Sequence, residues 1–122
     1  MYDAVVIGGG PIGSYTAGKL AEAGHDVAVL EREPQAGTGV CCTGIVSQEC
    51  VSAFDIDDSV ILKKVNSARL FSPSGNLLHV QREETQACIL DRAAFDLMMA
   101  NRAIKKGAKY LPDRLVSRLE NK

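Results

Sequence analysis

Three glycines close to the amino terminus follow the spacing G-x-G-x-x-G: Gly8, Gly10 and Gly13. The apolar run 2–7 precedes them, and a helical pattern over 11–23 follows. A second apolar run, 27–30, ends at the acid Glu31. A strand, a glycine turn, a helix and an acid about twenty residues later together indicate a dinucleotide-binding unit.

Each position in this motif has a physical reason. Gly8 permits a tight turn after the strand, and Gly10 lets the backbone approach a pyrophosphate because it has no Cβ. Gly13 lets the helix pack closely on the strands. Pro11 and Ile12 occupy the first helical turn, where the missing N–H of proline costs nothing. Free amides and the positive end of the helix dipole in that turn attract phosphate.

The acid at the end of the second run predicts which nucleotide binds. Glu31 can accept hydrogen bonds from both hydroxyls of an adenosine ribose, and its charge would repel a 2′-phosphate, which disfavours NADP. Arg32 follows it and is a further candidate binding residue. The alternative is that the glycines only make a tight turn. That alternative explains Gly8 and Gly24 but does not explain the acid Glu31 at the end of the second strand.

Length and composition describe an ordinary globular domain. The chain has 122 residues, of which 46% are hydrophobic and 24% charged, with a net charge of −1. The chain has no excess of basic residues, so its composition does not indicate nucleic acid binding. No apolar stretch is long enough for a membrane span, and no basic segment with a long apolar core marks a secretory signal. We therefore expect a cytoplasmic protein with one domain over residues 1–122.

Metal binding has little support in the sequence. The four cysteines contain no C-x-x-C pair: Cys41, Cys42, Cys50 and Cys88. We expect free thiols, three of them packing residues, and no metal. The acidic stretch 55–58 is expected to be a solvated turn, and a metal site there is the less favoured alternative.

The rest of the chain predicts further elements in a βαβ order. We expect a loop over 32–44, a short helix over 45–54, a hairpin with arms 64–72 and 76–81, a strand over 87–90, a helix over 92–106, a third parallel strand over 108–111 and a further strand from 115 to 119. The helix over 92–106 should have one mainly apolar face, formed by Phe95, Met98, Met99, Arg102 and Ile104. Strands three, two and one should lie side by side, in that order.

Three segments together resemble a known family. They are the stretch from Tyr2 to Glu31, the loop Cys41-Cys42-Thr43-Gly44, and Leu90-Asp91-Arg92-Ala93-Ala94-Phe95-Asp96 with Gly107-Ala108. They are similar to the FAD-binding amino-terminal part of the geranylgeranyl reductases, within the aromatic-hydroxylase-like flavoproteins. The resemblance implies an α/β, Rossmann-like, three-layer FAD/NAD(P)-binding domain whose parallel sheet carries an inserted β-hairpin. It also implies a truncated chain, because members continue into a Gly-Asp segment and a substrate domain.

The resemblance assigns roles to several residues. It implies that Glu31 binds the adenosine ribose of FAD and that Arg92 helps to hold the cofactor. The loop formed by Cys42, Thr43 and Gly44 should run past the ribityl and flavin side, and the backbone of Val116 should touch the adenine. Each has a plainer alternative: a surface arginine, a buried structural thiol at Cys42, and a core valine.

The function implied is a flavin-dependent oxidoreductase that reduces isoprenoid double bonds in lipids, at least in a complete form. FAD is the expected cofactor, and a lipid or isoprenoid the expected substrate of the complete protein. Peripheral membrane contact and self-association are further expectations for its partners. A hydroxylase, a quinone-linked dehydrogenase, an NAD-binding domain and a non-catalytic nucleotide-binding module are the alternatives. No general acid, base or nucleophile stands out, so no catalytic residue is assigned.

Overall fold

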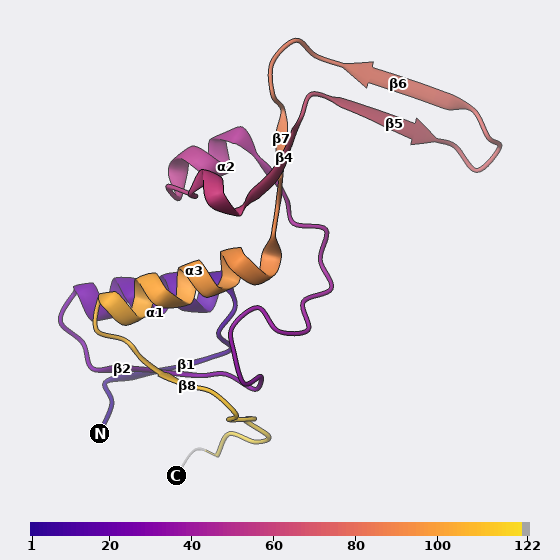
Figure 1. Cartoon of the computed structure of the whole chain (residues 1–122). Helices are drawn as coiled ribbons and strands as arrows, with labels where there is room; N and C mark the ends of the chain where they lie inside the picture. The colour runs from indigo at the N-terminus through magenta and orange to yellow at the C-terminus, as the bar shows by residue number, and fades with distance from the viewer. Residues whose placement is uncertain (121–122) are drawn as a thin grey trace. The chain divides into compact units, whose positions relative to one another are not determined.

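The glycine motif joins a strand to a helix, as its residue types predict. In the computed structural model, which describes residues 1–120, β1 (Ala4–Ile7) leads through the glycines into α1 (Pro11–Glu22). The chain then turns at Gly24, whose φ of +92° suits a residue without Cβ, and enters β2 (Val27–Leu30). Residues 31–44 contain no helix or strand, as predicted (Figure 1).

The chain forms two compact units, which we describe separately. The first comprises residues 1–41 and 92–122, and the second comprises residues 42–91. After the second unit, α3 (Arg92–Lys105) and β8 (Lys109–Leu111) return the chain to the first.

A parallel sheet supports the first unit. Its strand order is β1-β2-β8, with Ala4 beside Val27 and Ala28 beside Lys109. Strands three, two and one therefore lie side by side, which confirms the predicted α/β class and its parallel sheet. Because α1 and α3 both lie on one face of this sheet, the first unit contains two of the three predicted layers (Figure 1).

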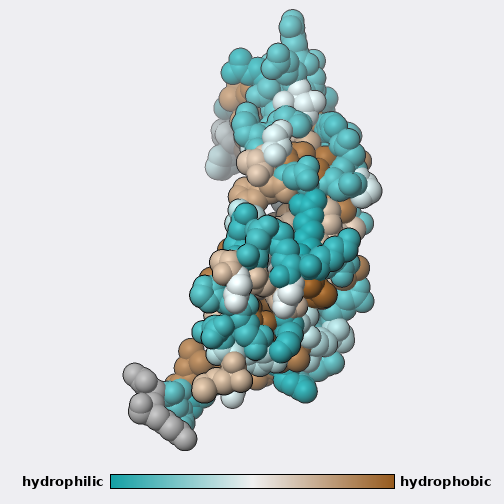
Figure 2. All heavy atoms as spheres, turned by 90° about the vertical axis from the view of Figure 1, so that its left-hand side faces the viewer, coloured by the Kyte–Doolittle hydropathy of each residue, from teal (hydrophilic) through white to brown (hydrophobic). Residues whose placement is uncertain are grey.

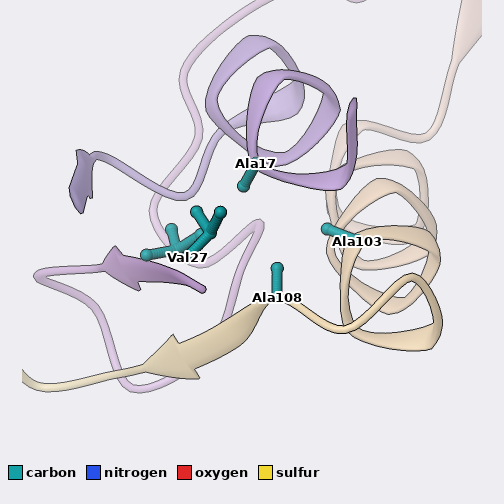
Figure 3. Packing of buried hydrophobic residues seen from close by; sticks show 5 residues of the cluster. Ala17, Val27, Ala103 and Ala108 are labelled. Carbon is teal, nitrogen blue, oxygen red and sulfur yellow. The ribbon is translucent and has the colours of Figure 1, made fainter. Parts of the chain in front are cut away.

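Small side chains bring the two helices and the sheet together. Ala17 of α1, Val27 of β2, Ala103 of α3 and Ala108 before β8 are fully or almost fully buried and point toward one another (Figure 3). A Cβ on Gly18 would lie 3.4 Å from the Cα of Ala103, so only small residues allow this helix spacing. Small alanine and glycine residues thus let α1 and α3 pack closely against each other.

A three-stranded antiparallel sheet and a separate two-stranded hairpin form most of the second unit. The central strand β7 (Ala87–Leu90) pairs with β3 (Ile45–Ser47) on one side and β4 (Ile61–Val65) on the other. A separate hairpin consists of β5 (Ser67–Phe71) and β6 (Leu77–Gln81). The helix α2 (Gln48–Ala53) and the 3-10 helix η1 (Asp58–Val60) complete the unit.

The short helix predicted over 45–54 is wrong in its first three residues. Residues 45–47 pair with β7, and α2 begins only at Gln48. Ser47 caps that helix because its hydroxyl accepts a hydrogen bond from the amide of Cys50, at 3.1 Å. The cap signal therefore marked the true start of the helix, and the apolar pair before it belongs to a strand.

The predicted hairpin is correct in its turn but not in its first arm. Residues 64–72 contain the end of β4, a break at Asn66 and then β5. The side-chain amide of Asn66 donates to the carbonyl of Arg82 at 2.9 Å, and the amide of Arg82 donates to the carbonyl of Asn66 at 2.8 Å. These bonds close the base of the hairpin where the strand ladder stops.

Two further expectations at the carboxyl side of the chain are wrong. Ile104 is 47% exposed, because the buried stripe of α3 runs through Phe95, Met99 and Ala103, with Asp96 beside it. The strand expected from 115 to 119 is not formed, and Leu115 and Leu119 are 71% and 79% exposed. An extended segment becomes a strand only when a neighbour satisfies its amides and carbonyls. Figure 2 shows hydrophobic residues, in brown, scattered among hydrophilic residues, in teal, on one face of the molecule.

Candidate cofactor site

The turn after β1 needs glycine at two positions for different reasons. Gly8 has a φ of +98°, and its amide donates to the carbonyl of Leu30 at 2.9 Å, which ties the turn to β2. A Cβ on Gly13 would overlap the carbonyl oxygen of Gly8 and lie 3.3 Å from Val6. Gly13 therefore lets α1 approach the strand.

Gly10 is different, because its surroundings are open. It has an ordinary backbone conformation (φ −67°, ψ 179°), and a Cβ there would meet no protein atom within 4 Å. The fold itself does not require glycine at this position. The empty space in front of Gly10 is where a ligand could approach the backbone.

The amino end of α1 opens onto the same space. Gly10 is the N-cap and supplies no side-chain acceptor, and Pro11 occupies the first turn together with Ile12 and Gly13. The first intrahelical amide bond comes from Ser14 to the carbonyl of Gly10, at 2.9 Å. The amides of Ile12 and Gly13 precede that bond, so they belong to the turn whose donors a helix leaves for other acceptors.

A hollow of about 200 Å³ lies beside this turn. Its walls come from three parts of the first unit: Gly9 and Gly10 of the glycine turn, Glu31 and the loop that follows it, and Asp96 of α3. The Gly10 backbone therefore lines one side of the hollow, and the carboxylate of Glu31 lines another. This pattern suits a ligand with a diphosphate and a ribose.

Glu31 is held in place by the backbone. Its Oε2 accepts a hydrogen bond from the amide of Gly9 at 2.5 Å, and its Oε1 accepts one from the amide of Glu33 at 2.9 Å. Each carboxylate oxygen has two lone-pair directions, so each can still accept a ligand hydroxyl. The carboxylate is thus fixed at the rim of the hollow without being saturated.

Sequence reasoning missed Ser14 and Tyr110, which lie behind the glycine turn. The hydroxyl of Tyr110 donates to the carbonyl of Gly9 at 2.6 Å, and that of Ser14 lies 3.1 Å from the same carbonyl. The two hydroxyl oxygens are 2.8 Å apart. Tyr110 lies 101 residues from Gly9 in the chain, so only the strand order could have indicated this contact.

The environment of Tyr110 raises the pKa of its phenol. Burial is the main cause, because it disfavours the charged phenolate, and the negative charges of Glu31 and Asp96 act in the same direction. The hydrogen bond from Ser14 opposes them by favouring the phenolate. Tyr110 is therefore a neutral donor at neutral pH.

Arg92 is engaged with its own helix. Its Nε and Nη2 donate to the two carboxylate oxygens of Asp96, at 2.8 and 3.1 Å. Asp96 is only 2% exposed, so this two-point ion pair fixes the guanidinium at the start of α3. Gly37 packs against the same helical turn, since a Cβ there would lie 2.8 Å from the Cα of Ala93.

The remaining predicted residues lie in varied surroundings. Arg32 is exposed and pairs with Glu33 at 2.9 Å, and Val116 is partly buried in an irregular segment. Cys42, Thr43 and Gly44 belong to the second unit, where Gly44 is buried and accepts a hydrogen bond from the amide of Leu90 at 2.9 Å. Cys42 and Thr43 are exposed, so the plainer interpretation of Cys42 as a buried thiol is wrong.

The cysteines differ in access. All four are free, as predicted, but Cys41 and Cys42 are exposed, Cys50 is intermediate and Cys88 is buried. The expectation that three of them pack inside is therefore wrong. Within residues 1–120 no group of three or more His, Cys, Asp or Glu side chains could hold a metal ion.

Comparison with known proteins identifies the family. Residues 3–92 match the family of FAD dependent oxidoreductases. The chain belongs to this family. FAD is therefore its cofactor, and the glycine turn, the N-terminus of α1 and the rim carboxylate fit the ADP half of that molecule.

Two relatives whose names state a function show which members of the family this chain resembles. The chain is 39% identical to a geranylgeranyl diphosphate reductase of Rhodobacter capsulatus, over 90% of this chain and 27% of the relative. It is 34% identical to a digeranylgeranylglycerophospholipid reductase of Methanosarcina acetivorans, over 89% of this chain and 28% of the relative. The chain thus spans less than a third of the length of these relatives. It is an FAD-binding portion that resembles geranylgeranyl reductases.

A solved structure agrees with the sequence comparison. The crystal structure of a geranylgeranyl bacteriochlorophyll reductase-like protein from Thermoplasma acidophilum matches with a TM-score of 0.82 and 33% identity. The match covers 92% of this chain and 30% of that protein. A flavin-dependent brominase, at 21% identity and a TM-score of 0.73, shares the fold. In the part of the chain that the structure describes, no helix has the length and apolarity needed to cross a membrane.

Proposed function

We propose that residues 1–122 act as one FAD-binding domain and that the hollow beside Gly10 holds the ADP half of the cofactor. The observation that carries this proposal is the pairing of open space at Gly10 with the fixed carboxylate of Glu31. In this arrangement the backbone of Gly8, Gly10 and Gly13 and the first turn of α1, at Pro11 and Ile12, face the diphosphate. The free lone pairs of Glu31 accept the ribose hydroxyls.

The same geometry predicts a preference for FAD over NADP. A 2′-phosphate would bring a second negative charge next to Glu31, in a hollow that Asp96 also lines. At a separation of about 4 Å, two like charges repel each other by about 1 kcal/mol in water and by about 4 kcal/mol near a protein surface. Arg32 does not offset this charge, because its guanidinium is paired with Glu33.

Arg92 and three loop residues are further members of the proposed site. The guanidinium of Arg92 is oriented by Asp96, which itself lines the hollow, so Arg92 can hold a phosphate or a ribityl oxygen near the start of α3. Cys42, Thr43 and Gly44 are proposed to pass the flavin side, and the backbone of Val116 to contact the adenine. These assignments rest on the family resemblance.

The proposed reaction of the complete protein is the reduction of isoprenoid double bonds in lipids. Two relatives are named for geranylgeranyl or digeranylgeranyl reduction, at 39% and 34% identity, and this naming supports the substrate class. Bound FAD supplies the transfer of reducing equivalents, and the protein binds, orients and shields it. The described residues of this chain contribute the nucleotide side of that site.

Calorimetric titration with FAD, ADP-ribose and NADP tests the binding proposal. We expect FAD and ADP-ribose to bind and NADP to bind more weakly, and purified chain that retains FAD should be yellow. Glu31→Ala should weaken FAD binding by roughly 1.5–3 kcal/mol, the range for hydrogen bonds to charged groups. Glu22→Ala is the matched control, because Glu22 is an acid of the same unit paired with Lys19 and Lys106. Tighter binding of NADP than of FAD would contradict the proposal.

Exposed apolar residues support self-association as a second proposal. In the hairpin Leu70 lies opposite Leu78 and Ala68 opposite Val80, so these four share one face. Leu70 and Leu78 are 53% and 59% exposed. Light scattering across a range of concentrations should detect dimers that Leu70→Ser with Leu78→Ser removes, and a strict monomer contradicts the proposal. Peripheral membrane contact and a cytoplasmic location stay predictions.

A further inference from the structure

The peptide groups of Gly9 are fixed at both ends by side chains from distant segments. The Gly9 amide donates to Glu31 at 2.5 Å, and the Gly9 carbonyl accepts from Tyr110 at 2.6 Å with Ser14 at 3.1 Å. Gly9 itself is buried, and any Cβ on it would overlap the phenol oxygen of Tyr110. Gly9 therefore lies between Glu31, which directly follows β2, and Tyr110 in the middle of β8.

The hydroxyl groups of Tyr110 and Ser14 can form their hydrogen bonds at the same time. Tyr110 has one hydroxyl hydrogen, which its 2.6 Å bond assigns to the Gly9 carbonyl. The hydrogen of Ser14 is then shared between that carbonyl, at 3.1 Å, and the Tyr110 oxygen, at 2.8 Å. Because Ser14 is only 1% exposed, water does not compete for these bonds. The two hydroxyls therefore act as one unit on one carbonyl.

Fixing this carbonyl also fixes the next amide. In a trans peptide the C=O of one residue and the N–H of the next point in opposite directions within one plane. The peptide bonds of the described residues include no cis bond. When Tyr110 and Ser14 hold the Gly9 carbonyl on the inner side, the Gly10 amide points away from them. Gly10 lines the hollow, so this amide faces the proposed diphosphate site.

We propose that Tyr110, together with Ser14, is a positioning residue that orients the Gly9–Gly10 peptide so that its amide binds the diphosphate. This inference rests on the proposed function and deepens it. Neither hydroxyl touches the ligand; both act through the backbone. Glu31 is bonded to the amide of the preceding peptide, Gly8–Gly9, and also to the amide of Glu33, so the ribose contact depends less on Tyr110 than the diphosphate contact does.

A truncation series of ligands tests this role. Tyr110→Phe keeps the ring and removes the donor, and Ser14→Ala removes its neighbour. We expect each variant to lose roughly fivefold in affinity for ADP, the value of one ordinary hydrogen bond, and the double variant to lose twentyfold or more. Binding of adenosine, which has no phosphate, should change less than twofold. Tyr15→Phe is the matched control, because Tyr15 is a half-exposed tyrosine on α1 outside the hollow.

A merely structural role gives a different result. Equal losses for ADP and adenosine, or no loss for either in the double variant, overturn the inference while leaving nucleotide binding itself intact. Failure of the unaltered chain to bind ADP overturns the proposed function instead.

Amide hydrogen exchange of the unliganded chain provides a second, ligand-free readout. In Tyr110→Phe, Gly9 loses a hydrogen bond at its carbonyl and is held less firmly. Its amide, which donates to Glu31, should therefore exchange at least several-fold faster than in the unaltered chain or in Tyr15→Phe. An unchanged exchange rate at Gly9 also overturns the inference.

Discussion

Arg92 and Asp96 form a two-point ion pair one helical turn apart, with bonds of 2.8 and 3.1 Å at the start of α3. An arginine in the first turn of a helix opposes the helix dipole. Asp96 offsets that cost, because its carboxylate lies beneath the guanidinium and is almost completely buried. The ion pair with Asp96 therefore stabilises the positive charge of Arg92 at the N-terminus of α3, where the helix dipole disfavours a cation.

Removal of the acid from this pair should destabilise the chain. Breaking a fully buried ion pair costs about 3–5 kcal/mol, and because the Arg92 side chain is 21% exposed we expect Asp96→Ala to cost about 2–3 kcal/mol. Urea unfolding measures the difference. Arg32→Ala removes an exposed ion pair to Glu33 and should change stability by less than about 0.5 kcal/mol. Equal effects of the two variants would contradict a structural role for Asp96.

Two glycines of one motif should respond oppositely to alanine. Gly10→Ala places its Cβ in open space, so the free energy of unfolding should stay within about 1 kcal/mol or rise slightly, while FAD affinity falls at least tenfold. Gly13→Ala forces a Cβ onto the Gly8 carbonyl and should destabilise the fold by about 3 kcal/mol or more. Thermal unfolding and FAD titration on both variants separate the two effects. If Gly10→Ala is destabilised, or if Gly13→Ala is as stable as the parent, the glycine turn does not have the geometry described above.

Sequence patterns predicted the parts of this fold that depend on neighbouring residues. Gly8, Gly13 and Glu31 stand in a local order whose geometry follows from the turn, the helix and the second strand. The contact of Tyr110 with Gly9 depends on where β8 lies, and no local pattern encodes it. Gly37 against Ala93 is similar, since a loop glycine indicates a turn but not its neighbour.

The apolar pattern gave wrong predictions where the presence or absence of a partner strand determines the secondary structure. Residues 45–47 carry the apolar pair expected of a helix, yet β7 lies beside them and pairs with them. Residues 115–119 have the composition of a strand, but their backbone is irregular within the described chain. In both places the available hydrogen-bond partner determines the structure more than the propensity does.

Alkaline pH should weaken the fold through Tyr110. Its pKa is raised by burial, so the folded chain retains the phenol proton at pH values where the unfolded chain has lost it. The stability that the neutral phenol contributes is fully present below pH 10, the ordinary pKa, and is lost as pH rises through the raised value. Urea unfolding at a series of pH values below and above 10 should show a steeper decline for the parent than for Tyr110→Phe. Tyr15→Phe should keep the parent's slope, and an identical slope in all three chains would rule out Tyr110 as the cause.

The four cysteines should react with a thiol reagent in the order of their exposure. Cys41 and Cys42 are exposed, whereas Cys88 is buried and lies 3.5 Å from the side-chain oxygen of Gln48. A thiol must be accessible to react with a reagent in solution, and burial removes that access. Mass spectrometry of a short alkylation time course should therefore find Cys41 and Cys42 labelled first, Cys50 later and Cys88 only after unfolding. If the proposed flavin-side position of Cys42 is correct, FAD should slow labelling of Cys42 more than labelling of Cys41. Equal slowing at both residues, or none, would remove Cys42 from the proposed cofactor contacts while leaving the site at Gly10 and Glu31 unaffected.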